Sequence, residues 1–178
     1  MVLEDFKMSI EKINQAKAEI AVTSAYKTIT AFFDADSFCE IDAFAKSGEG
    51  FAEVVAGFGT VEGMPVYAFA QNSDICGGAM SKAQAAKLKK LYGLALKTGA
   101  PIIGLLDSAG LRLQEGTDAL NAFASIYAKE AEASGVIPQI AAVFGNCGGG
   151  LAVAAGMADF AFMADDAKLF VNSPNALA

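Results

Sequence analysis

The sequence contains no histidine among its 178 residues. Histidine is the commonest general base near neutral pH and the commonest metal ligand in proteins, so its absence removes both options. Any catalysis by this chain must therefore rest on other groups, such as backbone amides, carboxylates or a base that a cosubstrate brings.

Positive charge is also scarce. The chain has 13 Lys and Arg against 20 Asp and Glu, which gives a net charge of −7. Nucleic-acid binding needs clustered Lys and Arg, because these side chains neutralise the phosphate backbone. We therefore expect no nucleic-acid partner.

Cysteine is rare, with three residues at Cys39, Cys76 and Cys147. Their wide separation and odd number match neither a zinc-binding spacing nor a disulfide framework, so reduced thiols in a cytoplasmic protein are the expected state. A secretory leader is not expected either, because charges occur throughout Met1–Lys12.

One long stretch, from Ala133 to Ala158, has no charge and would be long enough to cross a bilayer. Gly135, Pro138 and the Gly148–Gly150 cluster interrupt it, so we predict a loop, a short strand and a short helix instead. With 54% hydrophobic and 19% charged residues, the chain can bury a core. Its length suits one domain or a piece of a larger protein.

Hydrophobic periodicity and turn residues predict the main elements. Residues 2–33 have the apolar spacing of a helix, with a break at Thr23. Apolar runs on either side of a glycine turn predict a β-hairpin over residues 54–70. Ser81 and Thr117 are the predicted caps of two later helices.

Strands and helices alternate from Val54 onward, and the strands are apolar on both faces. This alternation indicates an α/β layer architecture. The other expected elements are strands over 38–44, 102–106, 140–144, 160–163 and 169–171, helices over 81–98, 117–134 and after Gly150, and a loop over 46–50.

Two glycine-containing junctions, Leu106–Leu111 and Asn146–Gly150, follow buried strands. Ligands of open α/β sheets bind at the carboxyl ends of the strands. If the two strands are neighbours, backbone amides from both junctions can converge on one oxygen as an oxyanion hole. Such a pair would stabilise an enolate formed from a thioester. The alternative is that the glycines serve only tight turns and close packing.

The second junction also allows a dinucleotide-binding turn. Gly145, Gly148 and Gly150 follow a strand, and Asp165 or Asp166 ends the next strand, where a ribose-binding acid belongs. The spacing is not G-x-G-x-x-G, which opposes this alternative. A phosphate loop of the G-x-x-x-x-G-K-[ST] type is excluded, because no lysine follows the glycines.

Charged residues near the junctions allow two interpretations each. Five lysines on the helix predicted over 81–98 can attract the phosphates of a nucleotide-like ligand, or they can form a solvated face. Arg112 and Glu115 either order their loop as an ion pair or remain exposed charges. The five lysines are Lys82, Lys87, Lys89, Lys90 and Lys97.

Six motifs occur in one order over nearly the whole chain. They are Phe33–Phe38, Gly57–Gly63, Gly77–Ser81, Asp107–Gly116, Ala133–Ile140 and Gly145–Gly150. With these motifs the chain resembles the N-terminal domain of the carboxyltransferase component of biotin-dependent acyl-CoA carboxylases and decarboxylases. Propionyl-CoA carboxylase β chains and methylmalonyl-CoA decarboxylase α chains are named members of the family that it resembles. The combination is specific, although each motif alone is weak.

The resemblance implies a crotonase-like α/β fold of repeated ββα units with an N-terminal helix. It also implies a single acyl-CoA-binding domain over residues 1–178, with the thioester oxygen held by backbone amides. The catalytic residues implied in this way are Gly110, Leu111, Gly149 and Gly150. The substrate-binding residues are Gly77, Gly78, Ala79, Met80, Ser108, Ala109, Cys147 and Gly148.

The implied reaction moves CO2 between carboxybiotin and the α carbon of a short acyl-CoA. The biotin ureido group takes the α-proton, which fits a chain without histidine, and the reverse path decarboxylates the acyl-CoA. Biotin would stand on a separate carrier, the biotin carboxyl carrier protein, and not on this chain. Members of this family are oligomers.

The usual chain of this family continues with a second crotonase-like domain, whereas this sequence stops at Asn175–Ala178. We therefore expect a fragment or one subunit of a split enzyme, holding half of a site and needing a C-terminal carboxyltransferase domain or subunit as partner. The competing hypotheses are a decarboxylase subunit, a non-catalytic assembly domain, and a hydratase or hydrolase that uses Glu115 as its acid or base.

Overall fold

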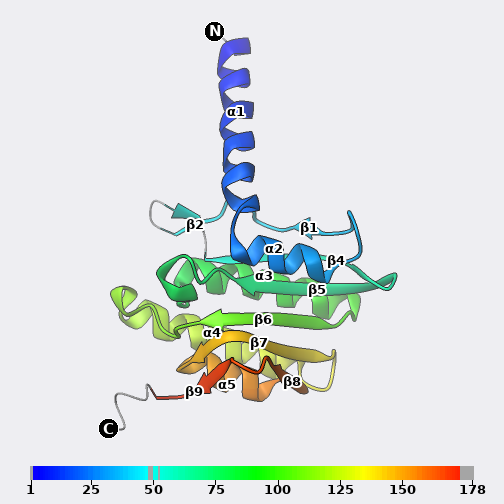
Figure 1. The fold of residues 1–178 in the computed structure, drawn as a ribbon, viewed down its shortest axis with the longest axis vertical. Coiled ribbons are helices and arrows are strands. Elements are labelled where there is room, and N and C mark those ends of the chain that lie inside the picture. Colours follow the sequence, from blue (N-terminus) through cyan, green and yellow to red (C-terminus); the bar gives the residue numbers. More distant parts are fainter. Residues whose placement is uncertain (1, 48–49, 52, 173–178) are drawn as a thin grey trace.

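The structure, a computed structural model, describes residues 2–47, 50–51 and 53–172. A mixed sheet of seven strands forms its centre, in the order β1-β4-β5-β6-β7-β8, with β9 also beside β7 (Figure 1). The strands of this sheet are β1 Cys39–Glu40, β4 Val54–Val61, β5 Met64–Gln71, β6 Ile102–Ser108, β7 Gln139–Gly148, β8 Phe160–Met163 and β9 Lys168–Phe170. The pairs β1–β4 and β4–β5 are antiparallel, and all later pairs are parallel.

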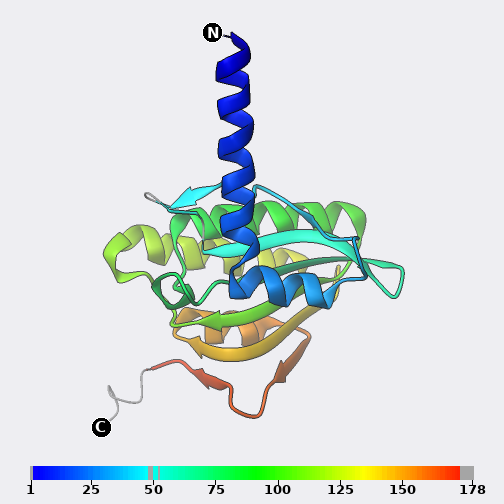
Figure 2. The ribbon, with the colours of Figure 1, turned by 45° about the horizontal axis from the view of Figure 1, so that its top comes forward.

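Two helices lead into the sheet, as the periodicity predicts. They are α1 Val2–Ala21 and α2 Ser24–Phe32. The predicted break is confirmed, because the Thr23 side chain caps α2. α1 extends away from the sheet (Figures 1 and 2), and Ile13 on it is 43% exposed, whereas Ile29 on α2 is fully buried against the sheet.

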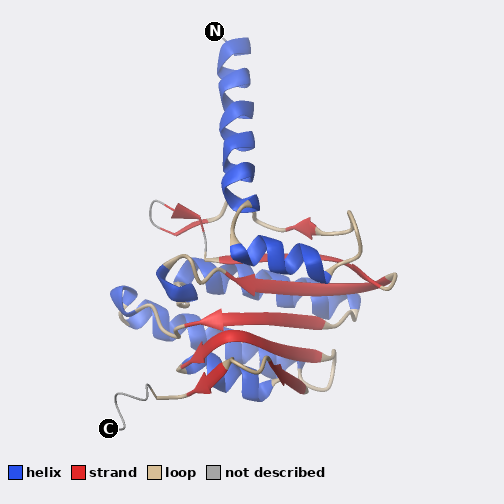
Figure 3. Ribbon diagram, viewed as in Figure 1, coloured by secondary structure: helices blue, strands red, loops and turns tan. Residues whose placement is uncertain are grey.

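Three further helices cover the opposite face of the sheet from α2 (Figure 3). They are α3 Lys82–Thr98, α4 Thr117–Ala133 and α5 Gly150–Met157. The predicted cap of α3 is confirmed, since the Ser81 hydroxyl accepts a hydrogen bond from the Gln84 amide at 3.1 Å. The predicted cap of α4 is wrong, because Thr117 is already the first helical residue.

The predicted hairpin is confirmed as β4 and β5, which pair from Val54 with Gln71 to Val61 with Met64. Hydrogen bonds connect the turn of this hairpin to Asp34, which follows α2. The Asp34 carboxylate accepts hydrogen bonds from the Thr60 hydroxyl at 2.7 Å and from the Gly63 amide at 2.9 Å. Together with α3, the hairpin forms a ββα unit.

Two local predictions before the hairpin are wrong. The strand expected over 38–44 is reduced to β1, because Asp42 adopts a positive φ of 47° that extended backbone does not allow. The loop expected over 46–50 contains a short antiparallel pair, β2 Lys46–Ser47 and β3 Gly50–Phe51. Residues 48–49 lie outside the described residues.

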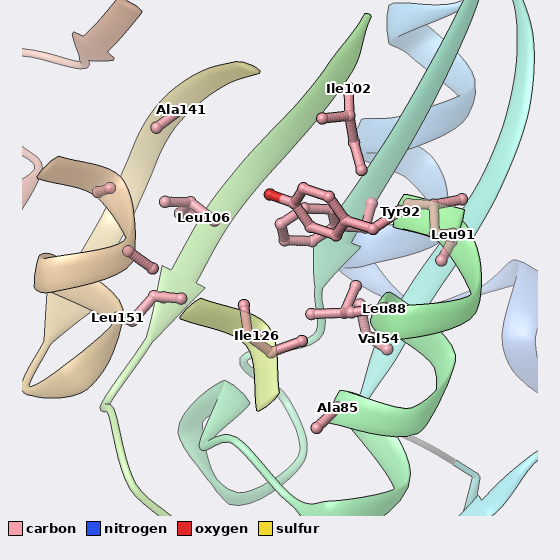
Figure 4. Close-up of a cluster of buried hydrophobic side chains, with 14 of the residues drawn as sticks. Val54, Ala85, Leu88, Leu91, Tyr92, Ile102, Leu106, Ile126, Ala141 and Leu151 are labelled. Carbon is pink, nitrogen blue, oxygen red and sulfur yellow. The ribbon is translucent and has the colours of Figure 1, made fainter. Parts of the chain in front are cut away.

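The core lies in two layers, because alternate residues of the strands face opposite sides. Tyr67 and Phe69 of β5 join the layer beneath α3, α4 and α5, whereas Ala68 and Ala70 join the layer beneath α2. Figure 4 shows the first layer, in which aliphatic side chains from the three helices meet those of the strands.

The uncharged stretch is divided into a loop after α4, a strand and the short helix α5, as predicted, but the strand β7 is longer than expected. No helix in the described part of the chain is long and apolar enough to cross a membrane.

Candidate active site

The strands that precede the two glycine junctions are neighbours. β6 and β7 pair in parallel from Ile102 with Gln139 to Ser108 with Cys147, so both junctions leave the sheet at the same edge. The sequence predicts converging amides only if these two strands are neighbours, and the structure meets this condition.

β7 runs further than the sequence predicts. It does not end at Gly145 but continues to Gly148, with an irregular register opposite Leu106–Ser108. The Asp107 carboxylate occupies this irregularity and accepts a hydrogen bond from the Asn146 amide at 3.0 Å. A Cβ on Gly145 would lie 2.3 Å from that carboxylate, so a larger residue would displace the Asp107 side chain; glycine here allows this close approach and does not form a turn.

The two junctions touch each other through their glycines. A Cβ on Gly110 would lie 2.9 Å from the Gly148 carbonyl oxygen and 3.6 Å from the Gly149 nitrogen. Gly110 also has a φ of 110°, a conformation that other residues rarely adopt. Both the backbone conformation and the contact therefore demand glycine at this position.

A third segment, Gly77–Met80, is hydrogen-bonded to the first of the two junctions. The Ala109 amide donates to the Gly77 carbonyl oxygen at 2.7 Å, and the Met80 amide donates to the Gly110 carbonyl oxygen at 2.7 Å. The structure thus brings all twelve predicted site residues into one cluster, which comes from three separate segments of the chain.

Burial divides this cluster into an accessible rim and a buried floor. Gly77 and Ala109 are exposed, and Leu111, Gly149 and Gly150 are half-buried. The buried floor consists of Gly78, Ala79, Met80, Ser108, Gly110, Cys147 and Gly148. Only the rim can touch a ligand without a rearrangement of the floor.

The backbone amides of the predicted catalytic residues differ in what they bind. The Gly110 amide donates to the Ser108 hydroxyl at 3.1 Å, and the Gly149 amide donates to the Phe170 carbonyl oxygen at 2.9 Å. The amides of Leu111 and Gly150 donate no hydrogen bond within the described residues. Gly150 is the first residue of α5, where the positive end of the helix dipole lies.

Cys147 belongs to the floor and is fully buried. Burial raises the pKa of its thiol to about 11, so the sulfur stays protonated near neutral pH. A nucleophilic role needs the thiolate, and this environment disfavours it.

Arg112 has a partner that the sequence did not indicate. Its guanidinium pairs with the buried carboxylate of Glu53, whereas Glu115 is 3.8 Å away. The predicted ion pair with Glu115 is therefore secondary. The sequence signal that could have pointed to Glu53 is its position as a charged residue directly before the apolar strand β4.

Glu115 has another contact. Its carboxylate accepts a hydrogen bond from the Lys82 amide at 2.7 Å, so it covers the first amide of α3. This contact weakens the hypothesis in which Glu115 acts as a free acid or base.

The lysine-rich helix is not one solvated face. Lys87 is 3% exposed and donates to the Glu40 carboxylate and to the Val54 carbonyl oxygen, both at 3.0 Å. Burial lowers the pKa of Lys87, and the negative charge of Glu40 opposes that shift. Lys82 and Lys90 pair with carboxylates at 3.1 and 2.6 Å. Lys87 therefore cannot attract a phosphate, and the interpretation of all five lysines as one phosphate-attracting patch is wrong.

The two aspartates that a dinucleotide-binding turn would use lie at the edge of the sheet. Asp165 and Asp166 form an exposed turn after β8, the strand beside β7. The described residues contain no cluster of three acids or cysteines that could hold a metal ion.

Comparisons with known proteins agree with the motifs. A family model for the carboxyl transferase domain matches residues 22–178. The methylmalonyl-CoA decarboxylase subunit alpha of Veillonella parvula is 39% identical over 165 residues, which are 85% of this chain and 32% of that protein. The propionyl-CoA carboxylase beta chain of Cereibacter sphaeroides is 38% identical over 168 residues, which are 86% of this chain and 32% of that protein. The chain spans about a third of the length of these curated relatives.

Solved structures share the architecture. The transcarboxylase 12S hexamer with methylmalonyl-CoA bound matches with a TM-score of 0.88 and 29% identity, over 99% of this chain and 39% of that one. The beta subunit of geranyl-CoA carboxylase from P. aeruginosa matches with a TM-score of 0.79 and 23% identity, over 98% of this chain and 36% of that one, which shows a shared fold. These neighbours are carboxyltransferases of the crotonase-like fold, and the predicted fold class is confirmed.

Proposed function

Because the chain belongs to the carboxyl transferase domain family, which matches it over residues 22–178, we propose that it forms the acyl-CoA-binding half of a biotin-dependent carboxyltransferase. The complete enzyme would move CO2 between carboxybiotin and the α carbon of a short acyl-CoA. The chain spans only about a third of its curated relatives, so this activity would belong to a larger protein or complex.

One observation carries the proposal: two amides without partners in the described residues, those of Leu111 and Gly150, stand on touching junctions. Both would donate to the thioester oxygen of an acyl-CoA. Loss of the α-proton or of the carboxylate leaves negative charge on that oxygen, and donors fixed in advance stabilise it without reorganisation. Removal of one such donor typically lowers kcat about 100- to 1,000-fold.

The site also fits a reaction whose base comes from elsewhere. Two carboxylates on the first junction and its loop are engaged, since Glu115 accepts from the Lys82 amide and Asp107 accepts from the Asn146 amide. We assign the base to biotin on a separate carrier, which would also deliver or accept CO2. This chain would hold the substrate, and its amides would bear the developing charge.

The remaining parts of the site would come from partners. We propose a C-terminal carboxyltransferase domain or subunit, and a biotin carboxyl carrier protein that visits the site. An oligomer is part of the proposal, supported by the hexamer of the transcarboxylase 12S neighbour.

Calorimetry with acyl-CoA thioesters tests the proposal directly. We expect the chain to bind propionyl-, methylmalonyl-, malonyl- or acetyl-CoA, and to bind NAD, the control, much more weakly. A folded sample that bound none of the four thioesters would contradict the proposal. Preferential binding of NAD would instead support a dinucleotide-binding turn.

A second candidate is the decarboxylase direction, which the likeness to the Veillonella decarboxylase subunit favours. The amides would act on the same oxygen in either direction, so the chain's own residues do not select one. Assay of the complete enzyme without added biotin separates the two: formation of methylmalonyl-CoA from propionyl-CoA that depends on ATP and bicarbonate indicates carboxylation, whereas multiple-turnover release of CO2 from methylmalonyl-CoA without ATP indicates decarboxylation. If neither direction were observed while the partner chains still assembled, a non-catalytic assembly role would remain.

A further inference from the structure

A buried carboxylate lies behind the loop that carries Leu111. Glu53 precedes β4 and is 1% exposed. Its carboxylate accepts a hydrogen bond from the Ser81 hydroxyl at 2.7 Å and pairs with the Arg112 guanidinium. One side chain therefore joins the start of β4, the start of α3 and the loop after β6.

These contacts stand beside the backbone that flanks Leu111. The Met80 amide donates to the Gly110 carbonyl oxygen at 2.7 Å, and the Arg112 amide donates to the Met80 carbonyl oxygen at 3.2 Å. Successive residues of an extended segment direct their amides to opposite sides. The Leu111 amide therefore points away from Met80 and stays outside this short ladder.

We propose that Glu53 is a positioning residue for the carboxyltransferase reaction. By holding Ser81 and Arg112, it would keep the Leu111 amide directed at the thioester oxygen. This inference rests on the proposed function, since only there is Leu111 a donor to substrate.

The physical reason is the cost of separating a buried pair. If Arg112 moved away, the Glu53 carboxylate would be left buried without its cation, which is strongly unfavourable. The pair therefore disfavours movements that would carry the backbone on the C-terminal side of Leu111 away from Glu53. Such restriction matters, because a misplacement of about 1 Å can lower a catalysed rate about 100-fold.

The test is Glu53→Gln in the complete enzyme that contains this chain. The amide keeps an acceptor for Ser81 but loses the charge of the closer of the two carboxylates that face Arg112. We expect kcat with propionyl-CoA to fall about 10- to 100-fold while KM changes less than about threefold, because the lost interaction acts mainly in the transition state.

Glu40→Gln is the matched control. Glu40 is also a carboxylate in a buried ion pair, but the side chain of its partner Lys87 donates to Glu40 and Val54 and to neither junction. We expect this variant to lose stability and to keep the kcat of the wild type. Equal falls in kcat for both variants would show a general structural effect and overturn the inference.

A spectroscopic measurement separates positioning from folding. Donors to the thioester oxygen shift the carbonyl stretching band of bound propionyl-CoA, labelled with ¹³C at the carbonyl, to lower frequency. We expect a smaller shift in Glu53→Gln and in Arg112→Lys, which keeps the charge but not the planar fork, and the wild-type shift in Glu40→Gln.

Arg112→Lys decides the question if Glu53→Gln does not fold. Wild-type kcat and an unchanged carbonyl band in Arg112→Lys would overturn the inference, whereas the proposed function would stand. Failure of the wild-type enzyme to bind any acyl-CoA would overturn the proposed function and the inference with it.

Discussion

Two buried ion pairs flank the hairpin strand β4, and they differ in what they join. Glu40 and Lys87 connect β1 at the sheet edge to α3, at 3.0 Å, with side chains 12% and 2% exposed. Glu53 and Arg112 connect the start of β4 to a loop of the candidate site, with side chains 1% and 19% exposed. The first pair lies within the scaffold, whereas the second reaches from the scaffold into the site.

The comparison shows that burial alone does not give a charge its role. Burying two charges costs desolvation that their attraction only roughly offsets, so neither pair need add net stability over apolar side chains. Each pair does penalise any movement that separates its members. Around α3 that penalty preserves packing, and around Leu111 it would preserve the direction of a catalytic amide.

Breaking the scaffold pair should have the largest effect on stability. Lys87→Met removes the cation and leaves both the Glu40 carboxylate and the Val54 carbonyl oxygen without their donor. We expect the free energy of unfolding to fall by about 3–5 kcal/mol, measured by urea titration. Restoring part of that loss with Glu40→Gln in the same chain would confirm the cause, and a neutral Lys87→Met would contradict it.

A third buried carboxylate, Glu130, extends the comparison because it forms no ion pair within the described residues. It is 6% exposed, its Oε2 has no hydrogen-bond partner among the described residues, and Tyr92 is its nearest donor at 3.5 Å. It lines a small cavity of about 20 Å³ together with Tyr92 and Gln139. Burial raises its pKa from 4.5 to about 7, against the opposing hydrogen bond from Tyr92.

This shift makes stability depend on pH. The Glu130 carboxyl binds its proton more tightly in the folded state than in the unfolded state. Its contribution to the free energy of unfolding is therefore fully present below pH 4.5 and is lost as the pH rises to about 7. We expect a decline of about 3 kcal/mol across this window relative to Glu130→Gln. Urea titrations of both proteins at several pH values measure it, and parallel pH profiles would refute this assignment.

Glycine substitutions extend the comparison to the backbone. Gly110→Ala forces a φ of 110° on alanine and places its Cβ 2.9 Å from the Gly148 carbonyl oxygen. We expect a loss of about 1–3 kcal/mol in unfolding free energy and a displaced Leu111 amide. A lower kcat of the complete enzyme with propionyl-CoA and a lower melting temperature would both be observed, and an unchanged melting temperature would contradict the contact.

The matched glycine in the scaffold should respond in the opposite direction. Gly93 lies inside α3, and a Cβ there would meet nothing within 4 Å. We expect Gly93→Ala to raise the unfolding free energy by about 0.5–1 kcal/mol, because alanine is the better helix former. Thermal melting measures this small gain, and destabilisation would show that α3 needs glycine for another reason.

Several elements could be predicted from the sequence because their causes are local. Ser81 caps α3 by bonding an amide three residues away, and Gly99 ends it with a φ of 70°. The junction after β6 could be located because glycine follows a short apolar strand. The end of β7 was misplaced, because Gly145 reads as a turn when its real constraint is the Asp107 carboxylate.

The sequence alone determined the family, the alternation of strands and helices, and the two glycine junctions, because these follow from local periodicity and ordered motifs. Only the tertiary structure decided that Arg112 pairs with Glu53, which is 59 residues away, and that Lys87 is buried. It also decided which amides are already engaged: Gly149 bonds to Phe170, whereas Leu111 and Gly150 donate to no other described residue. Spacing along the chain cannot show these differences, because they depend on which distant segments the sheet brings side by side.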